Sequence, residues 1–481
     1  MNYRMLGYLL GIILLIEAAL MALPTVVSAI YGEAVWPFLV TMAALIVIAA
    51  PFVIFKPKDT GIYAREGFVC VGAAWILMSA FGALPFVISG AIPNYIDAFF
   101  ETVSGFTTTG SSILRAVEGL PMGILFWRSF THWVGGMGVL VFMLAIMPSD
   151  NGRAMYLLRA EVPGPTKDKL VPKMRQSALI LYGIYVILTV IMVVALLFTG
   201  MDLYDSLVNS FATAGTGGFS VKNASIAGYN NPAAEWIIAV FMVMFGVNFN
   251  IYFLILVKKL KNIVRNEELR IYFIICTAAA AVISINTISS IAGLGIADGI
   301  RNAFFQVATI ISTTGFSTAD YALWPSLSKT VLVLLMITGA CAGSTAGGMK
   351  VSRVILSVKN IFRSIKQVIR PKSVNPVRMD GETVPDSTLQ STASYVSVYF
   401  AAIVLCVLVI SVDGFNFETN VTATLACLNN IGPGLGAVGP TGNFADFSML
   451  SKLVLSLVML VGRLEFMPLL ILFSPTTWKR H

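Results

Sequence analysis

Ten apolar runs, each near the ~20 residues that cross the hydrocarbon core of a bilayer, constrain this chain more than any other feature. They lie at 5–28, 36–55, 67–90, 122–147, 176–199, 233–257, 270–293, 328–349, 391–412 and 449–474. The mean hydropathy is +0.84, and 12% of residues are charged, against about 25% in soluble domains. We therefore predict an all-α integral membrane protein. The same figures exclude a disordered chain, a nucleic-acid-binding domain and an ordinary soluble enzyme.

The basic residues are unevenly distributed between the connections that join these runs. Of the 32 Lys and Arg residues, 25 fall near the chain ends or on alternate connections, with the largest groups at 153–175, 258–270 and 350–378. The opposite side carries six, namely Arg115, Arg128, Lys222, Arg301, Lys329 and Lys452, and the remaining one, Arg463, lies inside the last run. Because cytoplasmic loops are enriched in Lys and Arg, we predict that both termini are cytoplasmic. The net charge of +8 then reflects topology and indicates no nucleic-acid partner.

Four outer connections share one pattern, in which a moderately apolar stretch leads to small and hydroxyl residues around a glycine. They read DAFFETVSGFTTTGSS (97–112), DSLVNSFATAGTGGFS (205–220), NAFFQVATIISTTGFS (302–317) and TNVTATLACLNNIGPG (419–434). When Gly110, Gly218, Gly315 and Gly432 are aligned, a residue with N-cap chemistry stands thirteen positions before each, namely Asp97, Asp205, Asn302 and Thr419. We predict a short helix beginning at each of these caps.

The length of these helices, nine to eleven residues, is too short to cross a bilayer, so we predict re-entrant half-helices. Irregular backbone at that depth is tolerated only where protein buries it or where it lines a water-filled path. Each helix begins outside, so its negative C-terminal end faces the glycine loop and favours a dehydrated cation. The glycines permit φ values that are closed to other residues. Four such loops around one axis predict a carbonyl-lined cation filter rather than four surface hairpins.

The predicted filter residues are the last members of each motif. They are Thr108, Thr109, Gly110, Gly217, Gly218, Thr313, Thr314, Gly315, Asn430, Ile431 and Gly432. The fourth copy departs from the pattern, with Asn429-Asn430-Ile431 where the others have small or hydroxyl residues. The runs contain no paired aspartates, Ser/His couple or HExxH, so we expect neither an enzyme nor a bound organic cofactor. A carrier for organic solutes would need a group that anchors its substrate, and Arg463 is the only such group in the sequence that favours this alternative.

A glycine-rich segment and one arginine are candidates for a gate. Residues 338–348 (TGACAGSTAGG) lack any bulky side chain and contain four glycines, each costing about 1 kcal/mol relative to Ala in a helix. We predict a broken helix with a mobile loop below the filter, although close helix packing through small residues would use a similar composition. The candidate gate residues in this segment are Gly339, Gly343, Ser344, Thr345, Gly347 and Gly348.

Arg463 lies near the middle of the last run, where an arginine costs about 2.5–3.5 kcal/mol on insertion scales. It must face a cavity or a partner, and Glu465 is poorly placed on a helix to pair with it. A structural ion pair with another helix and a fixed positive charge in the pore both remain open. Three further polar residues are expected to be interhelical hydrogen-bond partners: His132, Asn248 and Asn250.

These motifs resemble the Trk/Ktr/HKT superfamily of potassium transporters, and within it the TrkH family, over nearly the whole chain. The resemblance implies two leading transmembrane helices followed by four pseudo-symmetric span–pore helix–span units, giving ten spans and four pore helices in a K-channel-like fold. The units are expected at 1–60 (leading helices), 61–150, 151–262, 263–375 and 376–481. The implied location is a bacterial inner membrane, with K+ as the transported ion.

The resemblance also implies partners and a gate. It predicts a homodimer and a cytosolic ring of nucleotide-binding regulatory subunits of the TrkA type, with contacts at 148–175 and 350–390. It predicts a gate formed by the loop at 338–348 together with Arg463. Relatives that pass sodium carry serine at the first filter glycine, so Gly110 favours potassium. The alternative is a sodium-permeable or poorly selective member of the same superfamily.

Overall fold

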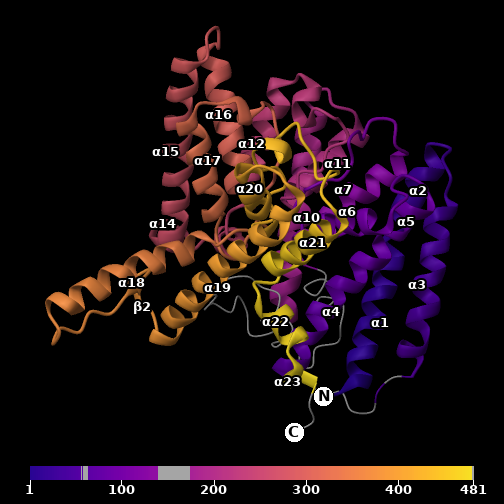
Figure 1. Ribbon diagram of the computed structural model, residues 1–481, viewed down its shortest axis with the longest axis horizontal. Helices are drawn as coiled ribbons and strands as arrows, with labels where there is room; N and C mark the ends of the chain where they lie inside the picture. The colour runs from indigo at the N-terminus through magenta and orange to yellow at the C-terminus, as the bar shows by residue number, and fades with distance from the viewer. Residues whose placement is uncertain (56, 58–62, 139–173, 479–481) are drawn as a thin grey trace.

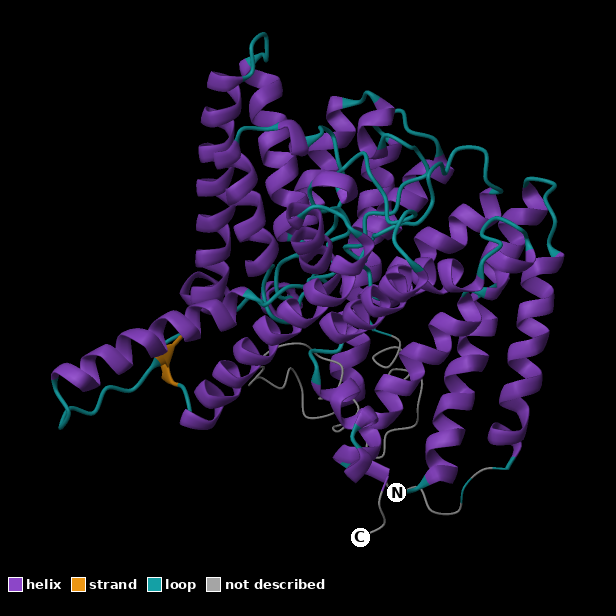
Figure 2. Cartoon of the chain, in the orientation of Figure 1, coloured by secondary structure: helices purple, strands orange, loops and turns teal. Residues whose placement is uncertain are grey.

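The computed structural model describes residues 1–55, 57, 63–138 and 174–478. Within these residues the fold is helical, and the only sheet is a hairpin in which β1 (Arg378–Met379) pairs antiparallel with β2 (Glu382–Thr383) (Figure 2). Some of the basic residues used for the topology prediction lie outside the described residues. So does nearly all of the region 148–175, which was predicted to contact the regulatory subunits.

The helices follow one another in an order that repeats short and long elements (Figure 1). The first group is α1 (Tyr3–Leu20), α2 (Ala22–Ile30), α3 (Trp36–Ile54), α4 (Ala64–Gly82), α5 (Leu84–Ile88), α6 (Tyr95–Phe106) and α7 (Met122–Gly136). The second is α10 (Met174–Leu197), α11 (Leu203–Ala214), η1 (Ser225–Tyr229), α12 (Pro232–Phe245), α13 (Phe249–Leu256) and α14 (Leu260–Arg265). The third is α15 (Glu267–Ser290), α16 (Ile296–Ile311), η2 (Tyr321–Leu323), α17 (Ser326–Thr338) and α18 (Val351–Ile369). The fourth is α19 (Asp386–Ile410), η3 (Ser411–Asp413), α20 (Phe417–Leu428), η4 (Gly436–Val438), α21 (Met449–Arg463), α22 (Met467–Phe473) and α23 (Pro475–Trp478).

Six helical segments of the described residues are long and apolar enough to cross a membrane, and a seventh results if α12 and α13, bent by 90°, count as one span. The six are Tyr3–Ile30, Trp36–Ile54, Arg65–Ile88, Ala178–Leu197, Glu267–Ser290 and Asp386–Asp413. They coincide with six of the ten predicted runs. The multi-pass character of the chain therefore follows directly from its helices.

The other four predicted runs are not continuous helices. Helices α7, α12, α17 and α21 have 15, 14, 13 and 15 residues. The runs 233–257, 328–349 and 449–474 are interrupted at 246–248, 339–350 and 464–466, while 122–147 continues beyond the described residues. Glycines near these ends permit close backbone approach. A Cβ on Gly135 would overlap the Phe106 carbonyl oxygen, and one on Gly462 would overlap that of Leu428.

The four short helices begin earlier than predicted. Helices α6, α11 and α20 have 12 residues and α16 has 16. Their N-caps are Asn94, Asp202, Gly295 and Asn416. The prediction that Asp97, Asp205, Asn302 and Thr419 are the caps is therefore wrong. The asparagine caps show the reason, because the side chain of Asn94 accepts from Asp97 N–H and that of Asn416 accepts from Thr419 N–H.

Two hydrophobic core clusters include residues of the short helices. One joins α1, α3 and α4 to α6, α7 and α21, and the other joins α10, α12, α15 and α17 to α16. Helix α11 contributes to both, with Val208 in the first cluster and Ala212 in the second. In Figure 1, α1 and α3 stand on one side and α15 on the other, with α20 and α21 between them. The short helices are thus divided between two hydrophobic clusters, with α11 in both.

Candidate ion pathway

The four predicted filter loops share one backbone conformation. Each has two residues in the left-handed region separated by one residue: Thr108 and Gly110, Thr216 and Gly218, Thr313 and Gly315, Asn430 and Gly432. The non-glycine residues have φ from 53° to 56°, a conformation that is uncommon for such residues and concentrates at functional sites. The repetition in four distant segments agrees with the alignment of the motifs. The same conformation identifies Thr216 as a member of the second loop, although the set predicted from the sequence omitted it.

The four loops form a closed ring. Each filter glycine faces the middle carbonyl oxygen of the next loop, so that an added Cβ would overlap that oxygen or come within 2.8 Å of it: Gly110 faces Gly217, Gly218 faces Thr314, Gly315 faces Ile431, and Gly432 faces Thr109. The fourth loop therefore returns to the first. Glycine is required at these four positions for two reasons. The backbone has a left-handed φ, and a Cβ would collide with the carbonyl oxygen of the next loop.

One kind of hydrogen bond supports the middle residue of every loop. Its N–H donates to a carbonyl five residues earlier, in its own short helix, at 2.8 Å in all four cases: Thr109 to Ser104, Gly217 to Ala212, Thr314 to Thr309, and Ile431 to Ala426. These four N–H groups are thus hydrogen-bonded to the short helices. The carbonyl oxygens of the same middle residues lie against the glycines of the neighbouring loops.

The fourth loop uses a side-chain amide where the first three have a threonine. Asn430 Nδ2 donates to Thr109 Oγ1 at 2.9 Å and to the Met459 carbonyl oxygen at 3.0 Å. Ser111 Oγ donates to the Gly432 carbonyl oxygen at 3.1 Å. The departure of this loop from the motif has a structural reason, because these bonds join the last loop to the first.

His132 stands behind the junction of the first two loops and is fully buried. Its Nδ1 lies 2.8 Å from the Gly105 carbonyl oxygen, and its Nε2 accepts from Phe219 N–H at 3.3 Å. The prediction that it is a hydrogen-bond partner between segments is confirmed. For Asn248 the prediction is wrong, because its side chain accepts locally from Asn250 N–H and caps α13.

A buried ion pair that the sequence reasoning missed holds the outer continuations of two loops. Arg128 Nε donates to Glu101 Oε1 at 2.6 Å, and both side chains are almost fully buried. Glu101 also accepts from Ser112 Oγ at 2.9 Å, while Arg128 donates to the Ser220 carbonyl oxygen at 3.1 Å. The position of Arg128 within an apolar run was the signal available in the sequence.

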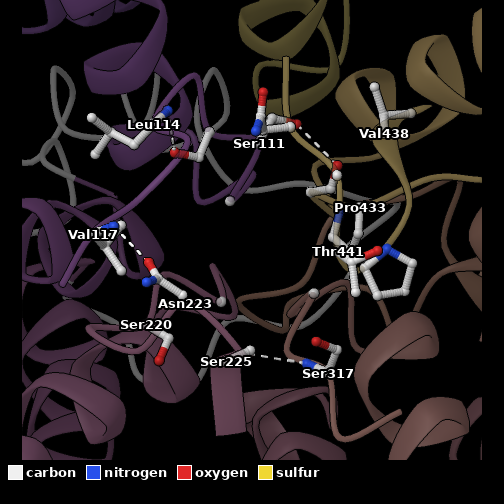
Figure 3. A pocket seen from close by; sticks show the side chains of 18 of the residues that line it. Ser111, Leu114, Val117, Ser220, Asn223, Ser225, Ser317, Pro433, Val438 and Thr441 are labelled. Atoms are coloured by element: carbon white, nitrogen blue, oxygen red, sulfur yellow. Dashed lines mark hydrogen bonds between the residues drawn. The ribbon is translucent and has the colours of Figure 1, made fainter. Parts of the chain in front are cut away.

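A pocket of about 140 Å³ opens on one side of the ring and is lined by all four filter glycines. Its remaining walls carry hydroxyl, amide and small side chains from all four repeats, together with the basic side chains of Arg115, Arg128 and Lys222 (Figure 3). Across it, Val117 N–H donates to Asn223 Oδ1 at 2.7 Å, and Ser317 N–H donates to Ser225 Oγ at 3.2 Å. The ring is therefore reached from a polar pocket to which all four repeats contribute.

The break predicted within the eighth run is present. Helix α17 ends at Thr338 and α18 begins at Val351, and we call the segment 339–350 between them the gate loop. Three of its candidate residues, Gly339, Gly343 and Gly348, have left-handed φ, which explains why the helix cannot continue. Ser344 Oγ donates to the Cys341 carbonyl oxygen at 2.6 Å, a bond within the loop.

Glu268 on α15 holds both ends of the gate loop. Its Oε1 accepts from Ala342 N–H at 2.7 Å and from Ser352 N–H at 3.1 Å. The carboxylate is 5% exposed, so these two donors satisfy a group that would otherwise be buried at a high cost. The loop is therefore attached to a long apolar helix as well as to its own flanks.

The gate loop contacts the predicted filter loops, and none of its residues lines the pocket. Gly347 N–H donates to Thr313 Oγ1 at 2.7 Å, and a Cβ on Gly347 would overlap the Asn429 carbonyl oxygen. Thr345 Oγ1 donates to the Phe245 carbonyl oxygen at 3.2 Å. Residues 345–347 thus lie directly beside the third and fourth filter loops.

Arg463 joins the gate loop to the first unit. Its guanidinium donates to the Thr345 carbonyl oxygen at 2.7 Å and to those of Gly135 and Gly136 at 2.6 and 2.8 Å. It stands at the end of α21 rather than in the middle of a helix, because Glu465 and the residue after it have left-handed φ. Glu465 pairs with Arg353 on α18 instead.

Comparison with known proteins places this arrangement in a family. The model of the TrkH family, described as cation transport protein, matches residues 38–480. The chain belongs to the TrkH family. Among its relatives are two potassium uptake proteins of Escherichia coli K12, TrkH at 36% identity over 100% of both chains and TrkG at 31% over 99% of both. The crystal structure of the potassium transporter TrkH from Vibrio parahaemolyticus superimposes with a TM-score of 0.89 at 32% identity, covering 100% of each chain. These TrkH-family relatives are transport proteins, in agreement with the expectation that the chain is not an enzyme.

Proposed function

We propose that this TrkH-family chain takes up K+ across the bacterial inner membrane through its ring of four loops. The observation that carries the proposal is the closure of the ring, in which every filter glycine faces a carbonyl oxygen of the next loop. Such a ring can replace the hydration shell of a cation with backbone oxygens. The names of the relatives support K+ as the ion.

In the proposed layout, α6, α11, α16 and α20 are re-entrant pore helices. Their negative C-terminal ends face the filter, where they favour a cation. Two leading helices (1–60) precede four units at 61–150, 151–262, 263–375 and 376–481, with ten crossings in total. Tyr3 stacks on Trp478 with ring centroids 6.5 Å apart, which supports both termini on one side of the membrane. The distribution of Lys and Arg is what favours the cytoplasmic side.

The gate loop and Arg463 form the proposed inner gate. The loop lies against the filter, and the guanidinium holds one of its carbonyl oxygens. A positive charge at this place raises the barrier for K+ until the loop moves. On the family resemblance we further propose a homodimer that is controlled by a cytosolic ring of nucleotide-binding subunits of the TrkA type.

The test is uptake of radiolabelled Rb+ by liposomes that contain the purified chain, with K+ or Na+ as competitor. We expect K+ to compete at much lower concentrations than Na+. Repeating the assay with an imposed proton gradient separates passive from coupled flux. Equal competition by Na+ and K+ would identify a poorly selective cation pathway and contradict the proposed filter. An absence of Rb+ uptake even in the Arg463→Ala variant would contradict the proposal as a whole.

A further inference from the structure

The junction between the first and second filter loops lies against two side chains of α7. At this junction the Gly217 carbonyl oxygen faces Gly110, and a Cβ on Gly217 would collide with the ring of His132. One turn earlier on α7, Arg128 donates to the Ser220 carbonyl oxygen at 3.1 Å. Because residues four apart lie on one face of a helix, α7 presents both side chains to the second loop.

Phe219, the residue after the filter glycine of the second loop, contacts both of these side chains. The guanidinium carbon of Arg128 lies 3.5 Å from the centroid of its ring, and the ring of His132 lies 4.2 Å away, measured between centroids. Phe219 N–H donates to His132 Nε2 at 3.3 Å. Since Nε2 accepts, Nδ1 carries the ring proton and donates to the Gly105 carbonyl oxygen at 2.8 Å. His132 therefore joins the second loop to helix α6 of the first repeat.

A carboxylate on α6 extends this attachment to the first loop. Glu101 accepts from Arg128 Nε at 2.6 Å, and it also accepts from Ser112 Oγ and Ile113 N–H, both at 2.9 Å. Glu101 is 1% exposed, and a buried carboxylate is tolerated only where it is paired and hydrogen-bonded. We call Glu101, Arg128 and His132 the brace. It joins the stretch after the first filter glycine to the stretch after the second.

The carboxylate of the brace has no equivalent in the other three repeats. The position nine residues before the filter glycine is Glu101 in the first repeat, and Asn209, Gln306 and Ala423 in the others. The amide of Asn209 donates to the hydroxyl of Tyr229 at 3.0 Å. Hydrogen bonds between ionised partners are stronger than those between neutral ones. At this position the first repeat is thus fastened by charge, whereas the other three have neutral side chains.

We propose that the brace sets the K+ selectivity of the ring, because it fixes the Gly217 carbonyl oxygen relative to Gly110. A carbonyl ring selects its ion by its size or by the field of its oxygens, and both depend on how firmly the oxygens are held. Arg128 and His132 act through the second loop and are positioning residues. The inference rests on the proposed function and deepens it, since it assigns ion preference to side chains outside the four motifs.

A contribution to folding alone is the competing explanation for the brace. In that case its loss would lower stability and leave the ion preference of the remaining folded molecules unchanged. The ratio of K+ to Na+ permeability does not depend on how many molecules in a membrane are folded. This ratio therefore separates the two explanations, with melting temperature as the independent measure of stability.

The first experiment measures Rb+ uptake into liposomes, with K+ or Na+ as competitor, for the full chain and for Arg128→Lys. Lysine keeps the charge but lacks the planar fork, so it cannot hold Glu101 and the Ser220 carbonyl oxygen in the same geometry. We expect the preference for K+ over Na+ to fall about tenfold, which corresponds to ~1.4 kcal/mol. Arg301→Lys is the matched control, because Arg301 pairs with Glu235 and Asp298 of helices α12 and α16. It should leave the preference unchanged.

The second experiment tests His132 with two neutral replacements. His132→Gln retains an amide that can accept from Phe219 N–H, whereas His132→Leu fills the space without either hydrogen bond. We expect the leucine variant to lose preference for K+ and the glutamine variant to lie closer to the wild-type chain. Melting temperatures of the purified variants show whether the fold is retained.

The outcomes distinguish this inference from the function on which it rests. If the wild-type chain prefers K+ and the folded Arg128→Lys and His132→Leu variants prefer it equally, the brace does not set selectivity and the proposed function stands. An equal loss in Arg301→Lys contradicts the inference as well. If Arg128→Lys does not fold, the two His132 variants decide the question. If the wild-type chain itself does not distinguish K+ from Na+, the proposed filter and this inference fail together.

Discussion

At the scale of single residues, the filter glycines differ from most other left-handed glycines of the chain. Gly110 and Gly119 both have left-handed φ, of +82° and +92°. A Cβ on Gly119 would meet nothing within 4 Å, whereas one on Gly110 would overlap the carbonyl oxygen of Gly217. A substitution at Gly119 thus strains only its own backbone, while one at Gly110 must also displace the next filter loop.

Gly110→Ser is therefore expected to weaken the preference for K+ over Na+. The displaced carbonyl of Gly217 changes the spacing of the ring, and a loss of about tenfold in the permeability ratio corresponds to ~1.4 kcal/mol of discrimination. Reversal potentials in mixed K+ and Na+ solutions measure this ratio. Gly119→Ser is the control and should leave it unchanged; an equal loss in both variants would refute the link to the ring.

Arg463→Ala is expected to raise basal flux in the absence of a regulatory partner. The substitution removes the bond to the Thr345 carbonyl oxygen and the positive charge beneath the filter, so both the attachment of the loop and the electrostatic barrier decrease. Rb+ uptake into liposomes measures the change. Arg463→Lys retains the charge and should lie between the two; flux equal to wild type in the alanine variant counts against a role in gating.

At the scale of elements, the gate loop replaces what hydropathy indicated to be the end of a spanning helix. Three left-handed glycines end α17, and contacts from α15, α21 and the third filter loop then hold the segment. The break could be predicted from composition, because four glycines within eleven residues weaken any helix. The position of the loop against the filter could not, since those contacts join residues far apart in the chain.

Gly347→Ala is expected to move the gate loop away from the filter. The residue has no left-handed φ, but its Cβ would overlap the carbonyl oxygen of Asn429, so the loop must shift and lose its bond to Thr313. We expect higher basal flux together with a lower melting temperature. Gly183→Ala, where a Cβ meets nothing within 4 Å, is the control and should increase stability because alanine favours the helix by about 1 kcal/mol. Unchanged flux in folded Gly347→Ala would show that this contact does not close the path.

At the scale of the whole molecule, the ring exists only when all four units are packed together. The two core clusters contribute different short helices, and Asn430 connects the last loop to the first. Carbonyl oxygens that converge on one axis repel each other when no cation lies between them. A cation bound at the ring is therefore expected to stabilise the native state.

Removal of K+ is accordingly expected to lower the thermal stability of the purified chain. A ligand that binds only the native state stabilises it by about 2.7 kcal/mol at a hundred times its Kd. Melting temperatures in K+, Na+ and N-methylglucamine at equal ionic strength measure the effect, and the order should be K+ highest and N-methylglucamine lowest. In the Gly110→Ser variant the difference between K+ and Na+ should shrink. Identical melting in all three salts would speak against a cation-binding ring.

The sequence by itself determined the features that depend on local composition and spacing. These are the membrane class, the four glycine motifs, the break within 338–348 and the unusual position of Arg463. They are visible because hydropathy, glycine content and repeat distance act over short stretches of chain. The helix caps were misplaced by three residues in three of the short helices, because several residues near each start have suitable side chains.

Only the tertiary structure decided which groups meet. The order of the loops around the ring, the role of Asn430 in closing it, the buried Glu101–Arg128 pair and the attachment of the gate loop to Glu268 all depend on packing. The physical reason is that hydrogen bonds and carbonyl approaches at about 3 Å depend on how whole helices pack. Neither a side chain nor its immediate neighbours specify that packing alone.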